Sequence, residues 1–166
     1  GTQKLPESQM DRFMIRVTMG YPSVEDEVSI MKSKTGGLSN RVLSKNVINA
    51  QDFMAMRDIV DEVYVDDSIY EYVAKIVAKT RDSDDILQGI SPRGSISIIN
   101  MAKAEAFLRG HDYVLPSDIQ FVLNDTMAHR IILNRSLKRG HITEESVIDS
   151  ICRSVDVPKI GTRGIL

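Results

Sequence analysis

The clearest helical pattern in this chain lies in residues 66–82, DDSIYEYVAKIVAKTRD. Within this stretch, apolar side chains recur at the i, i+3, i+4, i+7 and i+8 positions that form one face of a helix. They are Ile69, Tyr72, Val73, Ile76 and Val77. Aspartate and serine, which favour helix N-termini, precede this stripe. The stretch therefore predicts an amphipathic helix that packs by one face against other elements.

Similar signals on both sides of this stretch predict further helices. Their expected starts are Ser23 with Asp26, Asn49, Ser91-Pro92, Pro116 and Thr143. The helix after Ser91-Pro92 has apolar or small residues around much of its surface, which is typical of the central helix of a bundle. Gly110 is expected to end it. The segment between residues 82 and 89 is expected to be an acidic loop. The fold class predicted is mainly α, a helical bundle.

The first twenty residues have a different pattern. Residues 5–12 predict a short helix, and residues 13–17, Phe-Met-Ile-Arg-Val, predict a buried strand. Nothing later in the chain supplies a partner for this strand. We therefore expect a helix and strand left over from an α/β core, and an unpaired strand edge that recruits a second chain.

Composition excludes several functional classes. The chain has 166 residues, a net charge of −2 and a single cysteine, Cys152. A near-neutral charge provides no positive field for nucleic acid, and one cysteine cannot form an intrachain disulfide. No apolar run approaches the roughly 20 residues that span a bilayer. We expect a cytoplasmic protein without nucleic-acid or membrane partners. The basic residues Arg130, Arg135, Lys138 and Arg139 are interpreted as a solvated helix end.

Several kinds of reactive site are absent from the sequence. There is no G-x-x-x-x-G-K-[ST] loop to hold a triphosphate, and no apolar strand that ends in paired acidic residues to hold magnesium. The histidines at positions 111, 129 and 141 share no ligand spacing. The sequence therefore predicts no metal site within this chain.

Two arginines occupy unusual positions. Arg12 ends the short helix directly before the expected strand, and its simplest interpretation is a surface ion pair with Asp11 or Glu7. Arg93 lies in the first turn of the central helix, where the helix dipole disfavours a cation but favours a bound anion. A salt bridge from Arg93 to the acidic loop at residues 84–85 is an equally good interpretation.

A series of motifs resembles the MoxR-type AAA+ ATPases. The matching blocks occur in the family's order and spacing over residues 1 to about 133. They are Leu5-Pro6-Glu7-Ser8-Gln9-Met10-Asp11-Arg12-Phe13, Gly20-Tyr21-Pro22, Val63-Tyr64-Val65, Thr80-Arg81, Ser91-Pro92-Arg93-Gly94-Ser95, Ala102-Lys103-Ala104, the segment 110–119 and His129-Arg130-Ile131. The whole set is far more specific than any single motif.

The resemblance implies roles for four residues. Arg12 is similar to the arginine finger that reaches a neighbouring subunit's ATP, and Arg93 to the sensor 2 arginine that reaches the γ-phosphate of its own subunit. Tyr21 and Pro22 match the hinge beside the adenine. By the same resemblance, residues 1–20 would be the end of the AAA+ core, 21–155 the helical lid, and 156–166 a loose tail.

The resemblance also implies the cofactors and partners of the intact protein. Such an ATPase binds ATP and Mg²⁺, assembles into a homo-oligomeric ring, here expected to be a hexamer, and remodels or matures client proteins. A protein with a von Willebrand A domain is a further expected partner. The family's phosphate loop and magnesium-binding strand are missing from this sequence, so the simplest expectation is a piece of a longer ATPase. That piece alone would bind no cofactor.

Two other functions fit parts of the pattern. The helices around Pro116, followed by basic residues, are compatible with a DNA-binding domain, although the charge and the lack of a basic recognition helix count against it. A stand-alone adaptor bundle with methionine-rich faces is the second alternative.

Overall fold

Helices dominate the structure. The computed structural model describes residues 5–35, 47–134 and 142–159, apart from the side chains of residues 7 and 8. In chain order, the elements are α1 (Glu7–Met10), α2 (Val24–Thr35), α3 (Ala50–Glu62), α4 (Asp67–Asp82), β1 (Ile86–Gln88), α5 (Pro92–Leu108), α6 (Pro116–Met127), β2 (Ile132–Leu133) and α7 (Glu144–Arg153). Most of the expected basic cluster, at positions 135, 138 and 139, lies outside the described residues, as do His141 and the end of the expected tail.

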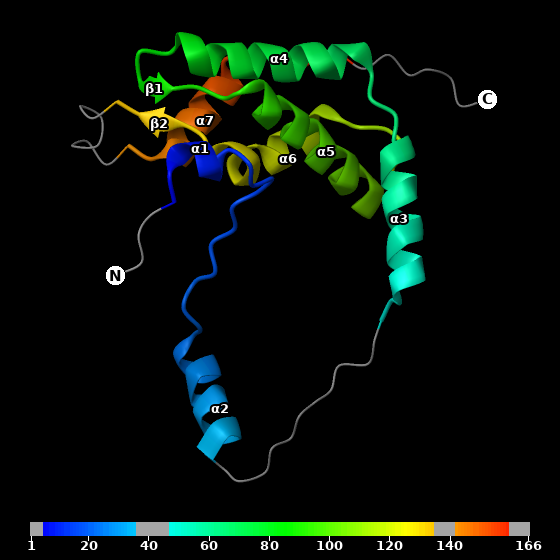
Figure 1. Ribbon diagram of the computed structural model, residues 1–166, viewed down its shortest axis with the longest axis vertical. Coiled ribbons are helices and arrows are strands. Elements are labelled where there is room, and N and C mark those ends of the chain that lie inside the picture. Colours follow the sequence, from blue (N-terminus) through cyan, green and yellow to red (C-terminus); the bar gives the residue numbers. More distant parts are fainter. Residues whose placement is uncertain (1–4, 36–46, 135–141, 160–166) are drawn as a thin grey trace.

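A single core lies between α4, α5, α6 and α7. As predicted, α5 is the central helix, and it packs against α3, α4 and α6, while α7 packs against α4 and α6 (Figure 1). The stripe predicted on residues 66–82 is buried throughout, with Ile69 and Ile76 fully enclosed. Ile98 of α5, Ile119 of α6 and Ile148 of α7 meet it in the same cluster. The mainly α fold class is therefore confirmed.

Most of the predicted helix starts are also observed. Asn49 and Asp52 form a reciprocal capping box on α3, and the Asp66 side chain accepts the Ser68 backbone N–H at the start of α4. Thr143 caps α7 in the same way. Gly110 follows α5 with a φ of 80°, a conformation in which a residue without a Cβ is favoured. Short-range capping signals were therefore reliable guides to element boundaries.

Residues 13–17 do not form the predicted strand. The sheet in the described part of the chain consists of β1 and β2, so these residues have no neighbouring strand to pair with. Phe13, Met14 and Val17 remain exposed. The Arg16 backbone N–H instead donates to the Asp125 carbonyl at 2.9 Å. The association of two chains that was expected from an open strand edge therefore loses its structural basis, although it stays untested.

One short strand, β1, replaces part of the expected acidic loop, and its partner β2 follows α6. β1 pairs with β2 in antiparallel fashion, with Ile86 opposite Leu133. Neither strand was predicted, because two or three residues are too few to show a period-2 pattern. Ile131, which lies between the end of α6 and β2, is also buried.

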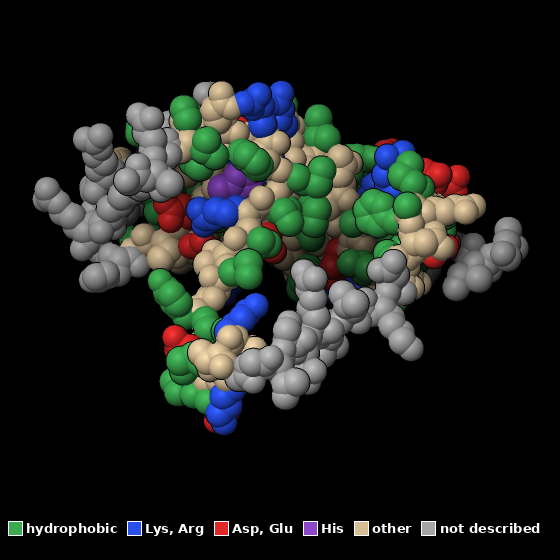
Figure 2. Space-filling view, turned by 60° about the horizontal axis from the view of Figure 1, so that its bottom comes forward, with side chains coloured by type: hydrophobic (Ala, Val, Ile, Leu, Met, Phe, Trp, Pro, Cys, Tyr) green, Lys and Arg blue, Asp and Glu red, His purple; other side chains and the backbone are tan. Residues whose placement is uncertain are grey.

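The expected inward faces of α2 and α3 are exposed. On α2, Val24 is 78% exposed and Met31 is 53% exposed, and α2 projects away from the compact part of the molecule (Figure 1). On α3, Phe53 is 59% exposed. Hydrophobic side chains are visible on this outlying region and on the compact part (Figure 2). The amphipathic pattern predicted these helices, but the described residues leave most of their apolar faces uncovered, apart from the end of α3 that packs against α5.

The end of α4 holds the start of α5. The fully buried Thr80 hydroxyl accepts the Ile90 N–H at 3.0 Å, and Arg81 Nε donates to the Ile90 carbonyl at 2.8 Å. Both backbone groups of Ile90 are therefore fixed, one residue before the Ser91 cap. Gly89 approaches the same turn closely, since a Cβ at this position would lie 2.7 Å from the Thr80 carbonyl oxygen.

Replacing Gly89 with alanine should destabilise the fold. The added methyl group would meet backbone atoms that cannot move without shifting α4, so we expect a loss of about 1–3 kcal/mol in the free energy of unfolding. Urea titration followed by circular dichroism at 222 nm measures this loss. Gly20→Ala is the matched control, because a Cβ there meets nothing within 4 Å. Equal stability of the two variants would contradict the close approach at Gly89.

Candidate functional site

Arg12 and Arg93 are both exposed and both without an ion pair among the described residues. Arg12 follows α1, and Arg93 lies in the first turn of α5. The surface pair proposed between Arg12 and Asp11 does not form, because Asp11 pairs elsewhere. The salt bridge proposed between Arg93 and the acidic residues 84–85 is also not found. Both guanidinium groups are therefore available to an anion.

One contact brings the two arginine-bearing segments together. The Ser91 hydroxyl caps α5 by accepting the Gly94 N–H at 3.4 Å. The same hydroxyl donates to the Asp11 carboxylate, at 2.9 Å and 3.0 Å from its two oxygens. A carboxylate beside a helix N-terminus is favoured by the helix dipole. Through this contact Asp11, which directly precedes Arg12, binds Ser91, which lies two positions before Arg93.

Arg130 lies beneath this contact and is the partner of Asp11. Its side chain is only 2% exposed, and its Nε lies 3.4 Å from an oxygen of Asp11. The interpretation of Arg130 as part of a solvated helix end is therefore wrong. A buried guanidinium is tolerated only when charge and hydrogen-bond partners replace water.

The remaining N–H groups of Arg130 bind the N-terminal segment to two helices. One terminal nitrogen, Nη2, donates to the Phe13 carbonyl at 2.7 Å and to the Ser97 hydroxyl of α5 at 2.9 Å. The other, Nη1, donates to the Thr126 carbonyl of α6 and to the Met14 carbonyl at 3.3 Å. The planar fork of arginine makes these simultaneous contacts possible, and lysine could not reproduce them.

Space for Arg130 depends on a glycine of the S-P-R-G-S block. A Cβ on Gly94 would lie 2.4 Å from Ile90 Cγ2 and 3.3 Å from Arg130 Cδ. The residue after Arg93 is therefore buried against the stem of Arg130. Three residues of this block therefore surround Arg130 in different ways: Ser91 binds its partner Asp11, Arg93 is a neighbouring cation, and Gly94 leaves space for its stem.

Electrostatics around Arg130 involve both Asp11 and Arg93. Burial lowers the pKa of Arg130, the Asp11 carboxylate acts in the opposite direction, and the nearby Arg93 cation lowers it further. Arginine remains charged even so. Arg93 and Arg130 are thus close enough to interact, and the Asp11 carboxylate is the ion-pair partner of Arg130.

His129 contributes a second contact to the N-terminal segment. Its ring is 5% exposed, and Nε2 lies 2.9 Å from the Phe13 carbonyl. Burial lowers the pKa of His129, and the cations Arg130 and Arg16 lower it further, while the Phe13 contact raises it. The neutral ring therefore donates through Nε2 to the same carbonyl that Arg130 binds. In the space-filling view, a histidine lies beside basic and acidic side chains on one face of the molecule (Figure 2).

The structure does not bring Tyr21 and Pro22 to the arginines. They belong to residues 17–23, an exposed segment that leads from the compact part towards α2 (Figure 1). Tyr21 is fully exposed. The contacts within this chain therefore do not test the expectation that Tyr21 and Pro22 lie beside an adenine.

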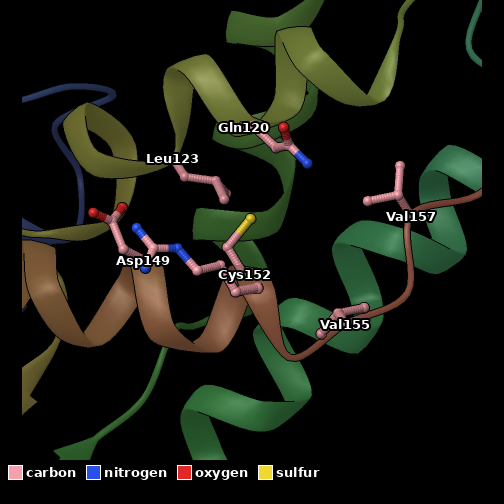
Figure 3. A pocket seen from close by; sticks show the side chains of 7 residues that line it. Gln120, Leu123, Asp149, Cys152, Val155 and Val157 are labelled. Carbon is pink, nitrogen blue, oxygen red and sulfur yellow. The ribbon is translucent and has the colours of Figure 1, made fainter.

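A separate hollow of about 390 Å³ lies between α6, α7 and the segment after α7 (Figure 3). Its lining residues are Gln120, Leu123, Asp149, Cys152, Arg153, Val155 and Val157. The Cys152 thiol, which is half-buried, lies 3.5 Å from the Tyr72 hydroxyl, and burial raises the pKa of Tyr72 to about 12. Neither candidate arginine lines this hollow, so it is not the site considered for ATP.

The described ranges contain neither a metal-binding cluster nor a membrane-spanning helix. No group of three or more acidic, histidine or cysteine side chains there could hold a metal ion. No helix in these ranges is both long and apolar enough to cross a membrane.

Asp11 and Arg130 are the site residues that sequence reasoning missed. Asp11 was interpreted as a surface ion-pair partner of Arg12, and Arg130 was grouped with the basic residues that follow it. The available signal was their presence in the D-R-F and H-R-I blocks, far apart in sequence but both within the resemblance. Only the fold shows that Asp11 and Arg130, which are 119 positions apart in the sequence, are in contact.

Comparison with known proteins agrees with the described architecture. The AAA lid domain family matches residues 78–151, which include the end of α4, all of α5 and α6, and most of α7. The uncharacterized protein YeaC of Bacillus subtilis is 39% identical over 95% of this chain and 49% of its own length. Chaperone MoxR1 of Mycobacterium tuberculosis is 31% identical over 96% of this chain and 44% of its own length.

A solved structure shows the same arrangement. The crystal structure of a candidate ATPase from Cytophaga hutchinsonii matches 96% of this chain with a TM-score of 0.82 and 32% identity, over 51% of its own chain. The chain thus spans about half the length of the relatives it matches. From the lid family match, the MoxR relatives and this shared fold, it follows that the chain belongs to the MoxR-type AAA+ ATPases and contains their helical lid.

Proposed function

We propose that this chain is the lid and arginine-bearing part of an ATPase that hydrolyses ATP at subunit interfaces to remodel client proteins. The observation that carries the proposal is the contact between Asp11 and Ser91, which places two exposed arginines on adjoining segments. Arg12 and Arg93 would balance the negative charge that develops on the transferring phosphoryl group. The relative named chaperone MoxR1 supports the chaperone-like role.

The other parts of the proposal rest on the family. Magnesium would be held by residues outside the described ranges, since these offer no metal-binding group. Tyr21 and Pro22 would lie beside the adenine once the core and lid of the intact protein surround it. A homo-oligomeric ring, a hexamer in its simplest form, would supply the subunit interface. A von Willebrand A domain protein as partner and a cytoplasmic location complete the proposal by analogy alone.

The geometry favours one revision of the sequence-based assignment. That assignment gave Arg12 to the neighbour's ATP and Arg93 to the ATP of its own subunit. The contact between Asp11 and Ser91, however, is made within one chain. Side chains carried by two segments in contact are expected to reach one nucleotide. We therefore propose that Arg93 acts with Arg12, on the neighbour's ATP.

A DNA-binding function has less support. Arg130, which contributed to the basic cluster, is buried and donates to backbone carbonyls, so it cannot meet a phosphate backbone. The described residues add no basic recognition helix in its place. The ATPase proposal accounts for both exposed arginines, whereas a DNA-binding role does not.

The purified chain alone should hydrolyse no ATP above background. It lacks the phosphate loop and the magnesium carboxylate that phosphoryl transfer requires in such enzymes. A coupled phosphate-release assay with Mg²⁺ measures this directly, with heat-denatured chain as the control. Steady release that disappears on denaturation would contradict the proposed division of labour.

Mixed assemblies of full-length subunits should show which nucleotide each arginine serves. A subunit with a disabled phosphate loop has no working pocket but carries intact arginines. Mixed with Arg12→Ala subunits, it should restore part of the activity, because a finger in trans is typically worth about 10³–10⁵ in rate. Mixed with Arg93→Ala subunits, it should restore activity as well if Arg93 also acts in trans.

Three outcomes separate the possibilities, given confirmed co-assembly. Recovery in both mixtures supports the shared pocket. Recovery only with Arg12→Ala returns Arg93 to the ATP of its own subunit, as the sequence first implied. No recovery in either mixture, despite loss of activity in each parent variant, contradicts action in trans.

A further inference from the structure

The relative position of Arg12 and Arg93 is set by residues other than themselves. Neither arginine has an ion pair in the described part of the chain, and both are exposed. Their backbone neighbours, by contrast, are fixed: Asp11 precedes Arg12, and Ser91 lies two residues before Arg93. The link between these neighbours is the Asp11 carboxylate, which accepts the Ser91 hydroxyl at 2.9 Å.

Asp11 is itself held in place by the buried side chain of Arg130. The guanidinium of Arg130 is almost fully enclosed, and it lies 3.4 Å from the Asp11 carboxylate. Its other contacts reach the Phe13 carbonyl on one side and the Ser97 hydroxyl of α5 on the other. One rigid side chain therefore holds both ends of the arrangement, the N-terminal segment and the helix that carries Arg93.

From these contacts we propose that Asp11 and Arg130 form a positioning pair, which holds Arg12 and Arg93 at a fixed spacing for the phosphates of one bound nucleotide. This inference rests on the proposed ATPase function and adds two residues that do not touch the nucleotide. The consequence is that the arginines move together with α5 and α6, not with residues 17–23, which are exposed and belong to no helix or strand.

The test uses Asp11→Asn in the full-length ATPase that carries this chain. Asparagine keeps the size of the side chain but removes the charge opposite Arg130. We expect kcat to fall by about tenfold to a hundredfold, because small misplacements of a catalytic group have effects of that order. The KM for ATP should change little, because Arg12 and Arg93 act mainly on the charge that develops on the transferring phosphoryl group. A purely structural role would lower assembly or thermal stability instead.

Glu145→Gln is the matched control. It breaks the ion pair between Arg16 and Glu145, which joins the same N-terminal segment to α7 at 3.1 Å, with both side chains about half exposed. Exposed pairs of this kind contribute little to stability. This variant should therefore keep the wild-type kcat, which would show that the effect of Asp11→Asn is specific to the Arg130 contact.

A second variant protects the test against misfolding. Arg130→Lys retains a cation for Asp11 but loses the fork that also reaches Phe13 and Ser97, so it should lower kcat in the same way. In an Arg12→Ala, Arg93→Ala background, Asp11→Asn should cause no further loss, because the groups it positions are gone.

The outcomes distinguish this inference from the proposed function. Folded, assembled Asp11→Asn enzyme with a kcat within twofold of the wild type overturns the positioning role, while loss of activity in Arg12→Ala keeps the ATPase proposal. A full further loss in the background without both arginines also overturns it. If Arg12→Ala and Arg93→Ala retain wild-type rates, the proposed site fails and the positioning pair fails with it.

Discussion

A buried guanidinium can exist in this fold only if its charge and its N–H groups find partners. Arg130 meets most of this requirement: its charge is paired with the Asp11 carboxylate, and its terminal N–H groups donate to groups of α5 and α6 and to carbonyls of the N-terminal segment, while Nε makes the ion pair but no hydrogen bond. Removing the charged partner of a buried ion typically costs about 3–5 kcal/mol. Asp11 is about a quarter exposed, so solvent screens part of that effect here. Even so, the constraint ties a segment near the start of the chain to helices more than eighty residues away.

The same constraint explains why the fold is organised around α5. Thr80 and Arg81 fix the residue before the Ser91 cap, and Ser91 in turn meets Asp11. Gly94 leaves room for the Arg130 stem. Each of these residues belongs to a sequence block shared with the family, and each acts on the beginning of one helix. What the lid supplies is thus a helix N-terminus with a defined position, on which Arg93 is exposed.

Local patterns in the sequence predicted most of this fold. Capping residues and the apolar stripe of α4 depend only on neighbours within one or two turns, so they could be recognised without tertiary information. The strand expected at residues 13–17 failed because an apolar run does not specify whether a partner exists. The exposed faces of α2 and α3 show the same limit, since periodicity reveals an apolar face but not what covers it.

The candidate site was predictable only in part, for a related reason. Arg12 and Arg93 could be found from motifs, because their surroundings in sequence are unusual for a cation. Asp11 and Arg130 could not, since a buried ion pair between positions 119 apart has no local signature. Basic residues grouped along a chain suggest a solvated surface, yet burial of Arg130 is decided by the contacts of α5 and α6.

The claim that Asp11 and Arg130 fix the two arginine-bearing segments relative to each other is tested most directly by measuring the distance between these segments in the intact ATPase. Spin labels at the exposed positions Gln9 and Asn100, in a background in which Cys152 and every other native cysteine of the intact protein are replaced by serine, report that distance within one subunit when diluted with unlabelled subunits. The account predicts one narrow distance distribution that is the same with and without nucleotide. A broad or two-peaked distribution, or a narrow peak that disappears on dilution because it joins different subunits, would contradict it.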